Sequence, residues 1–225
     1  MLPPGLLLLL TVQSTDTLRV RPVDRAPTMD GVATVEEYGR PALTIPTAQG
    51  GVQVWAVWRG DTAWIAARLQ DSTYYWGDDF VVSIDPLGDR TPGPGHDDTQ
   101  WYLRRMLDSS VVNQGRHGRW MPPNDDPDWR LGASRSTENW AVQGNSGPRE
   151  WSVELRLPLT WLTDETGRRA TIALRSYDDS PHAWYSWPAP RTGERPTRVE
   201  MDPGQWAEVE REMGDGRRET GNGRQ

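Results

Sequence analysis

Residues 52–70 read VQVWAVWRGDTAWIAARLQ, and they carry the clearest structural signal in the chain. Apolar side chains occupy alternate positions before and after residues 59–62 (RGDT), which have the composition of a tight turn. Alternation with a period of two is typical of a strand that faces a core on one side and water on the other. We therefore expect a β-hairpin, with Trp58 on the apolar face and Trp64 opposite the aliphatic residues of its strand.

The same period recurs along the chain and predicts further strands, over 80–84, 151–157, 99–107, 137–142, 170–177 and 205–212. For the last segment, Asp202-Pro203 leaves a short helix open as an alternative, because Pro is favoured at the first helical position. The sequence shows no long amphipathic helical pattern, and its loops are rich in Gly and Pro. The predicted fold class is all-β, a single antiparallel β-sandwich of jelly-roll or immunoglobulin-like type.

The composition narrows the function classes. The 225 residues suit one domain, and the 25 basic residues, all arginine, are outnumbered by 32 acidic ones. A net charge of -7 argues against nucleic acid as a partner. The chain has no Cys, which excludes disulfides, thiolate metal sites, iron–sulfur clusters and covalent heme. Its 13 Trp residues each carry about 150–250 Å² of surface that must be buried or used on a ligand.

The first residues contain a run of leucines, residues 6–10, followed by TVQS. This run is shorter than the roughly 20 residues of a membrane span, but it has the form of the apolar region of a secretory signal. We therefore expect a signal segment over 1–16, a β-sandwich domain over 17–213 and a disordered polar tail over 214–225. The protein would be secreted or periplasmic, in a bacterium with a GC-rich genome. The alternative is the frayed apolar end of a cytoplasmic protein.

Four stretches together resemble a known family. They are residues 26–31 (APTMDG) with 36–38 (EEY), residues 52–71, residues 76–86 (WGDDFVVSIDP) and residues 151–158 (WSVELRLP). In this order and spacing they resemble the carbohydrate-binding modules of family 9 and the wider DOMON-like group of sugar- or heme-binding sandwiches. The resemblance covers about residues 25–212. It implies a β-sandwich that holds a sugar between aromatic side chains, with structural calcium nearby.

The resemblance also implies which side chains contact the sugar. By position, Trp76 and Trp187 correspond to the aromatic residues that enclose the ring, Arg104 to a polar contact, and Trp184 to a further ligand contact. Val81 stands where the family often has a Glu. A flat indole can cover the apolar C–H face of a pyranose while planar polar side chains bind its hydroxyls. The expected partner is an oligo- or polysaccharide.

Metal, cofactor and catalytic residues are few in the sequence. Asp97 and Asp98 precede a predicted strand in a Gly-rich loop, where backbone carbonyls can complete the coordination of calcium. The three His residues lack metal-ligand spacing and no nucleophile motif is present, so we expect non-catalytic binding. Two alternatives stay open. One is a b-type heme carrier with Met106 and His182 as axial ligands, and the other is an envelope or partner-docking domain without a small-molecule ligand.

Overall fold

The computed structural model describes residues 16–73, 75, 77–106, 111–121, 141–166, 168–178 and 182–213. The predicted signal segment up to residue 15, the predicted tail 214–225 and Trp76 lie outside the described residues. Among the helices that the structure describes, none combines the length and the apolar character needed to cross a bilayer.

Strands dominate the described part of the chain, which confirms the all-β class. The strands are β1 (Thr17–Pro22), β2 (Leu43–Ile45), β3 (Val52–Arg59), β4 (Thr62–Gln70), β5 (Asp79–Asp85), β6 (Thr99–Arg104), β7 (Val111–Arg116), β8 (Arg119–Met121), β9 (Ala141–Ser146), β10 (Glu150–Pro158), β11 (Arg168–Asp178), β12 (Ala183–Trp187) and β13 (Ala207–Arg211). The helical turns between them are short, namely α1 (Val35–Tyr38), η2 (Leu159–Trp161), α3 (Pro196–Val199) and η3 (Pro203–Gln205).

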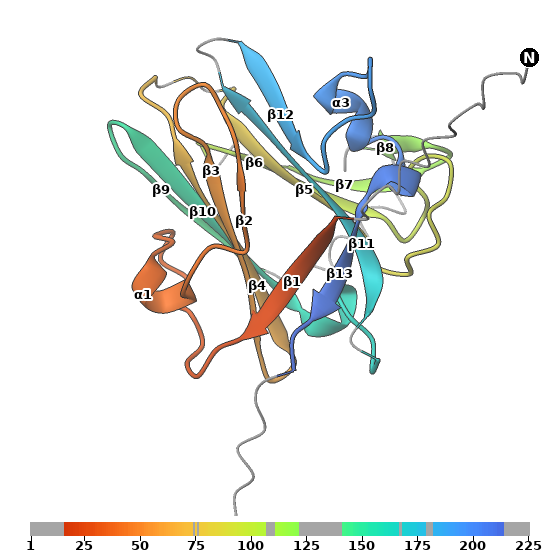
Figure 1. Cartoon of the computed structure of the whole chain (residues 1–225), viewed down its shortest axis with the longest axis horizontal. Coiled ribbons are helices and arrows are strands. Elements are labelled where there is room, and N and C mark those ends of the chain that lie inside the picture. The colour runs from red at the N-terminus through yellow and green to blue at the C-terminus, as the bar shows by residue number, and fades with distance from the viewer. Residues whose placement is uncertain are drawn as a thin grey trace, which may run out of the picture.

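The strands form two sheets that β1 joins (Figure 1). The first sheet has the order β3-β4-β10-β9, with β2 also paired to β3, and the second has the order β8-β7-β6-β5-β11-β13, with β12 beside β11. β1 pairs with β13 over Thr17–Val20 and with β3 over its last two residues, and both pairings are parallel. The other described pairs are antiparallel. The parallel crossing of β1 between the sheets is the one departure from the predicted antiparallel sandwich.

The interior lies between the sheets and is built from the alternation read in the sequence. One face of the β3–β4 hairpin contributes its aliphatic residues to a single apolar cluster, together with alternate residues of β5, β6, β10 and β11. Trp151 is 3% exposed within this core, and Trp58 packs against it. The sequence prediction that both indoles face the core is thus confirmed.

The outer face of the first sheet is also covered. Trp55, Val57 and Trp64 form a second apolar cluster with Tyr38 of α1. The indole N–H of Trp55 donates to the backbone carbonyl of Gly39 at 2.8 Å, which ties the end of α1 to the sheet. Trp64 is therefore opposite the aliphatic residues of β4, as predicted, and it is buried in this second apolar layer.

A buried carboxylate holds this covering segment in place. Glu154 of β10 is fully buried and accepts hydrogen bonds from the Gly31 N–H and the Tyr38 hydroxyl, both at 2.6 Å. The Ser152 hydroxyl donates to the Gly31 carbonyl at 2.5 Å. Burial raises the pKa of Glu154, because desolvation outweighs the two hydrogen bonds that favour the charged form. The Asp-Gly motif and the Trp-Ser-Val-Glu strand, distant in sequence, meet in this contact.

Some strands differ from the expectation drawn from the sequence. β6 ends at Arg104, and the described part of β9 begins at Ala141. In the last segment the predicted strand is confirmed as β13, and the alternative of a helix over these residues is wrong, since Asp202 caps only the short η3 turn through the Gly204 N–H. The sequence pattern does not reveal β1, β2, β7, β8 or β12. The residues of β12, AWYSW, follow no apolar–polar alternation, so the segment reads as a loop.

Candidate functional site

Four side chains align across the second sheet, and we name them the aromatic row. The strand register places Arg104 of β6 beside Asp79 of β5, Asp79 beside Tyr177 of β11, and Tyr177 beside Trp184 of β12. Phe80 and the other residues that alternate with the row belong to the core, so the row lies on the outer face of the sheet. Asp79 is fully buried, while the other three side chains are partly exposed.

The row presents aromatic rings next to a guanidinium group. The ring centroids of Tyr177 and Trp184 are 4.4 Å apart with planes at 44°, and the ring of Tyr75, from the loop before β5, is 6.4 Å from Tyr177. The guanidinium carbon of Arg104 lies 5.3 Å from the ring centroid of Tyr102. Partly exposed rings beside a planar cation can cover an apolar ligand face while the cation donates hydrogen bonds to hydroxyls.

The structure places two of the ligand contacts predicted from the sequence, Arg104 and Trp184, at the two ends of the aromatic row. Trp187 lies three residues beyond Trp184 in β12, on the opposite side of the strand, where it packs against the interior cluster. It is therefore not part of the row. Trp76 lies outside the described residues. Sequence reasoning missed Tyr177, because alternation along β11 gives its face but only the strand register shows that it lies beside Trp184.

Acidic side chains gather at the other end of β5. One carboxylate oxygen from each of Asp85, Asp89 and Asp97 lies within 4.8 Å of the other two. Asp79 of the row begins β5 and Asp85 ends it, so about 20 Å of extended strand separates the two sites. The sequence pointed to Asp97 with Asp98, and the structure adds Asp85 and Asp89, which the intervening loop brings back to the end of the strand.

Two buried oxygens of this loop, Asp97 Oδ2 and Asp98 Oδ1, have no hydrogen-bond partner among the described residues. The second oxygen of Asp98 accepts the Gly95 N–H at 2.7 Å. Burial raises the pKa of both carboxyl groups, that of Asp98 to about 7, and the charge of Asp85 raises them further. A hard cation with oxygen ligands would satisfy these atoms, so the residues present fit a calcium ion.

The two residues named for the heme alternative lie near the ends of β6 and β12. Met106 is 39% exposed just after β6. His182 stands before β12 with φ 60°, and its Nδ1 is 3.3 Å from the Tyr177 hydroxyl. Neither of the two pockets described next is lined by Met106 or His182. The heme hypothesis stays a prediction.

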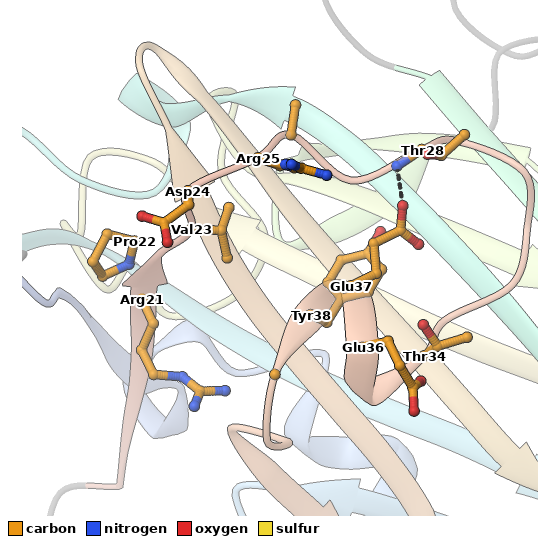
Figure 2. A pocket seen from close by; sticks show the side chains of 12 residues that line it. Arg21, Pro22, Val23, Asp24, Arg25, Thr28, Thr34, Glu36, Glu37 and Tyr38 are labelled. Atoms are coloured by element: carbon orange, nitrogen blue, oxygen red, sulfur yellow. Dashed lines mark hydrogen bonds between the residues drawn. The ribbon is translucent and has the colours of Figure 1, made fainter.

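Two polar pockets lie on the outer side of the first sheet. The larger, about 830 Å³, lies between the end of β1 and α1, with Arg21 and Arg25 on one wall and Glu36 and Glu37 on the other (Figure 2). Glu37 links α1 to the segment that carries Arg25, since its Oε1 accepts the N–H of Thr28 at 2.5 Å (Figure 2). The smaller pocket, about 490 Å³, includes lining residues Arg59, Asp61, Trp64 and Arg156. The aromatic row is on the other sheet, so the candidate site is a sheet surface instead of either pocket.

A buried ionic cluster adjoins the aromatic row. Arg105 follows Arg104 and its side chain is 1% exposed. Its guanidinium contacts the carboxylates of Asp71 at 3.1 Å and Asp78 at 3.5 Å. One arginine between two buried acids leaves a net negative charge. Burial, together with the hydrogen bond and charge of Asp71, raises the pKa of Asp78 to about 7, against the opposing effects of the Tyr75 N–H and Arg105.

We expect this cluster to make stability depend on pH. Between the ordinary carboxyl value of 3.8 and the folded pKa of about 7, the folded chain holds a proton on Asp78 that the unfolded chain has lost. Stability should therefore fall as the pH rises through this window and level off above it. In Asp78→Asn, the decrease in unfolding free energy across this pH window should be smaller by on the order of 2 kcal/mol. Urea unfolding between about pH 4 and 8 in EDTA measures the unfolding free energy at each pH. If it falls equally steeply with pH in the variant and the wild type, Asp78 is not the group responsible.

Comparisons with known proteins support the fold. The sequence matches no protein-family model and no curated protein. The solved structures with a similar fold include two of a family-9 carbohydrate-binding module from Caldicellulosiruptor kristjanssonii. The one in complex with glucose has a TM-score of 0.61 at 14% identity, covering 86% of this chain and 95% of that one. The one in complex with cellotriose has a TM-score of 0.60 at 14% identity, covering 88% and 94%. The resemblance to family-9 modules read in the sequence is thus confirmed as a shared fold, and the wider DOMON-like resemblance stays a prediction.

Proposed function

We propose that this protein binds oligo- or polysaccharide without catalysis, through the aromatic row on the outer face of the second sheet. The observation that carries the proposal is the alignment of Arg104, Tyr177 and Trp184, all partly exposed, across adjacent strands. The structural neighbours add support, because both were solved with a glucose-based ligand.

The side chains of the row suit the two surfaces of a sugar. Trp184 and Tyr177 would cover the apolar C–H face, and covering about 100 Å² contributes roughly 2.5 kcal/mol. Arg104 would donate hydrogen bonds to ring hydroxyls. Trp76, which precedes Gly77 in the same loop as Tyr75, is proposed as a further stacking residue on the strength of the family resemblance. In this proposal Tyr177 takes the place expected for Trp187, whose side chain packs against the core. After the cost of association, such a site gives micromolar to millimolar affinity.

Removing either end of the row should weaken sugar binding. Trp184→Ala is expected to raise the Kd for cellotriose about tenfold or more, since it deletes a stacking surface, and Arg104→Ala should have a similar effect. Isothermal titration with cellotriose and a panel of other oligosaccharides measures this. Arg156→Ala is the matched control, because Arg156 is an exposed arginine on the outer face of the first sheet. A Kd unchanged in Trp184→Ala while the wild type binds would refute the site.

We propose that the protein binds saccharide without hydrolysing it and that it is exported. Glycoside hydrolysis uses a pair of carboxylates on either side of the scissile bond. The aromatic row has one carboxylate, Asp79, and it is fully buried. Incubation with oligosaccharides should therefore release no shorter sugars. Export is supported by the leucine run 6–10, and a periplasmic reporter fused to residues 1–30 tests it, a cytoplasmic reporter signal being the contrary result.

We further propose a structural calcium ion at the end of β5, held by Asp85, Asp89 and Asp97, with Asp98 beside it. The support is the convergence of three carboxylate oxygens within 4.8 Å and the buried, unpartnered oxygens of Asp97 and Asp98. Because Asp85 lies at the opposite end of β5 from the row, this ion would stabilise the loop and would not touch the sugar.

Calcium should therefore change the unfolding free energy of the protein more than its affinity for saccharide. With a Kd on the order of 10 μM, about 1 mM calcium should add roughly 2.7 kcal/mol to the unfolding free energy over the EDTA-treated protein. Asp97→Asn should remove most of this gain, whereas Asp24→Asn, an exposed aspartate on the outer side of the first sheet, should keep it. Calorimetry with and without EDTA provides the measurement. An equal calcium effect in both variants would argue against the proposed ligands.

A further inference from the structure

Arg105 connects three chain segments at the rim beside the aromatic row. Its Nε donates to Ser146 Oγ of β9 at 2.9 Å and its Nη2 to the Gly147 carbonyl at 2.7 Å. Its Nη1 donates to the carboxylate of Asp71, which follows β4, and forms an ion pair with that of Asp78, which precedes β5. One buried guanidinium therefore links the end of the first sheet to the start of the strand that carries Asp79 of the row.

The loop between these two aspartates is fixed by the same arginine. Arg105 Nη1 also donates to the Thr73 carbonyl, and the Arg105 backbone N–H donates to the Asp78 carbonyl at 2.9 Å. Asp71 in turn accepts hydrogen bonds from the N–H and the hydroxyl of Thr73, both at 2.8 Å. Asp78 accepts the Tyr75 N–H at 3.0 Å. Among the described residues of loop 71–78, Asp71, Thr73 and Asp78 are thus attached to Arg105.

Tyr75 connects the residues held by Arg105 to the aromatic row. The Tyr75 backbone is held by Asp78, and its ring lies 6.4 Å from the ring of Tyr177. The ring centroids of Tyr177 and Trp184 are 4.4 Å apart. Arg105 itself is buried and lies behind the row, so it can act on a ligand only through these residues.

We infer that Arg105 is a positioning residue for saccharide binding, which holds loop 71–78 so that Tyr75 completes the aromatic surface formed by Tyr177 and Trp184. The inference rests on the proposed function. The planar guanidinium is needed because its donors point to separated acceptors in fixed directions, while a lysine ammonium is a compact point charge with three donors. Lysine keeps the charge between Asp71 and Asp78 but cannot reach all the acceptors of the arginine.

The test compares Arg105→Lys with Glu154→Gln. Glu154 lies under the segment that covers the first sheet, so its replacement weakens the fold away from the aromatic row. We expect Arg105→Lys to raise the Kd for cellotriose about fivefold or more through loss of pre-organisation, with Glu154→Gln staying within about twofold of wild type. Titration at a temperature where unfolding curves show all variants folded supplies the affinities. Faster exchange of the Tyr75 amide hydrogen in Arg105→Lys reports on the loop directly.

The outcomes separate this inference from the proposed function. If Trp184→Ala weakens binding and Arg105→Lys leaves both Kd and Tyr75 exchange unchanged, the positioning role is wrong while the sugar site stands. If both Arg105→Lys and Glu154→Gln weaken binding equally, the effect is general destabilisation and the inference also fails. If the wild type binds neither cellotriose nor any other oligosaccharide in the panel, the proposed function fails and the positioning role falls with it.

Discussion

Replacing Gly31 with alanine is expected to lower the unfolding free energy by about 3–5 kcal/mol, a large part of the stability of a domain. Gly31 has φ +84°, and a Cβ atom built there would lie 2.4 Å from the carbonyl carbon of Gly144 in β9. Because the obstacle is backbone, the loop must move outward. That movement would break the hydrogen bond from the Gly31 N–H and leave the fully buried Glu154 carboxylate with fewer donors.

Gly39 provides a matched control for this prediction. It also has a positive φ, +71°, but a Cβ atom there would meet nothing within 4 Å. Gly39→Ala should therefore cost only the strain of placing a side chain at φ +71° and ψ −155°, a backbone region that favours Gly, which is about 1–3 kcal/mol. Denaturant unfolding followed by Trp fluorescence measures both variants. Equal losses would show that the contact between Gly31 and Gly144 is not what makes the first position sensitive.

The second large effect is expected at Arg105. Arg105→Met should destabilise the fold by about 3–5 kcal/mol, because it leaves Asp71 and Asp78 as buried carboxylates without their shared cation. Arg191→Met is the comparison, since the ion pair of Arg191 with Asp202 is exposed and such pairs contribute at most about 1 kcal/mol.

A double variant separates charge from packing in this prediction. Adding Asp78→Asn to Arg105→Met removes one of the two uncompensated acids and should restore about 1–3 kcal/mol. The four unfolding free energies form a double-mutant cycle. A coupling energy near zero would mean that Asp78 does not contribute to the effect of Arg105, which would then stabilise the rim through Asp71, Ser146, Thr73 and Gly147.

The aromatic row shows why a site can be only half predicted from sequence. Arg104 and Trp184 were expected as contacts from a resemblance, and Tyr177 was placed in a predicted strand. That they form one row with Asp79 depends on three strand registers, which pair residues far apart in the chain. The proposed calcium ligands can also be predicted only in part from the sequence. Asp97 and Asp98 stand out as neighbours in sequence, whereas Asp85 and Asp89 join them only through the folding of the loop.

The all-β class, the β3–β4 hairpin and the inward faces of β5 and β10 can be predicted from the sequence, because the side-chain period of a strand is local and can be read along the chain. The tertiary structure was needed to show that Trp64 is covered by a second apolar layer that includes Tyr38, that Trp187 points inward from β12, and that β1 crosses in parallel between the sheets. Alternation separates the two sides of a strand. What lies against each side depends on long-range pairing, which residue spacing does not encode.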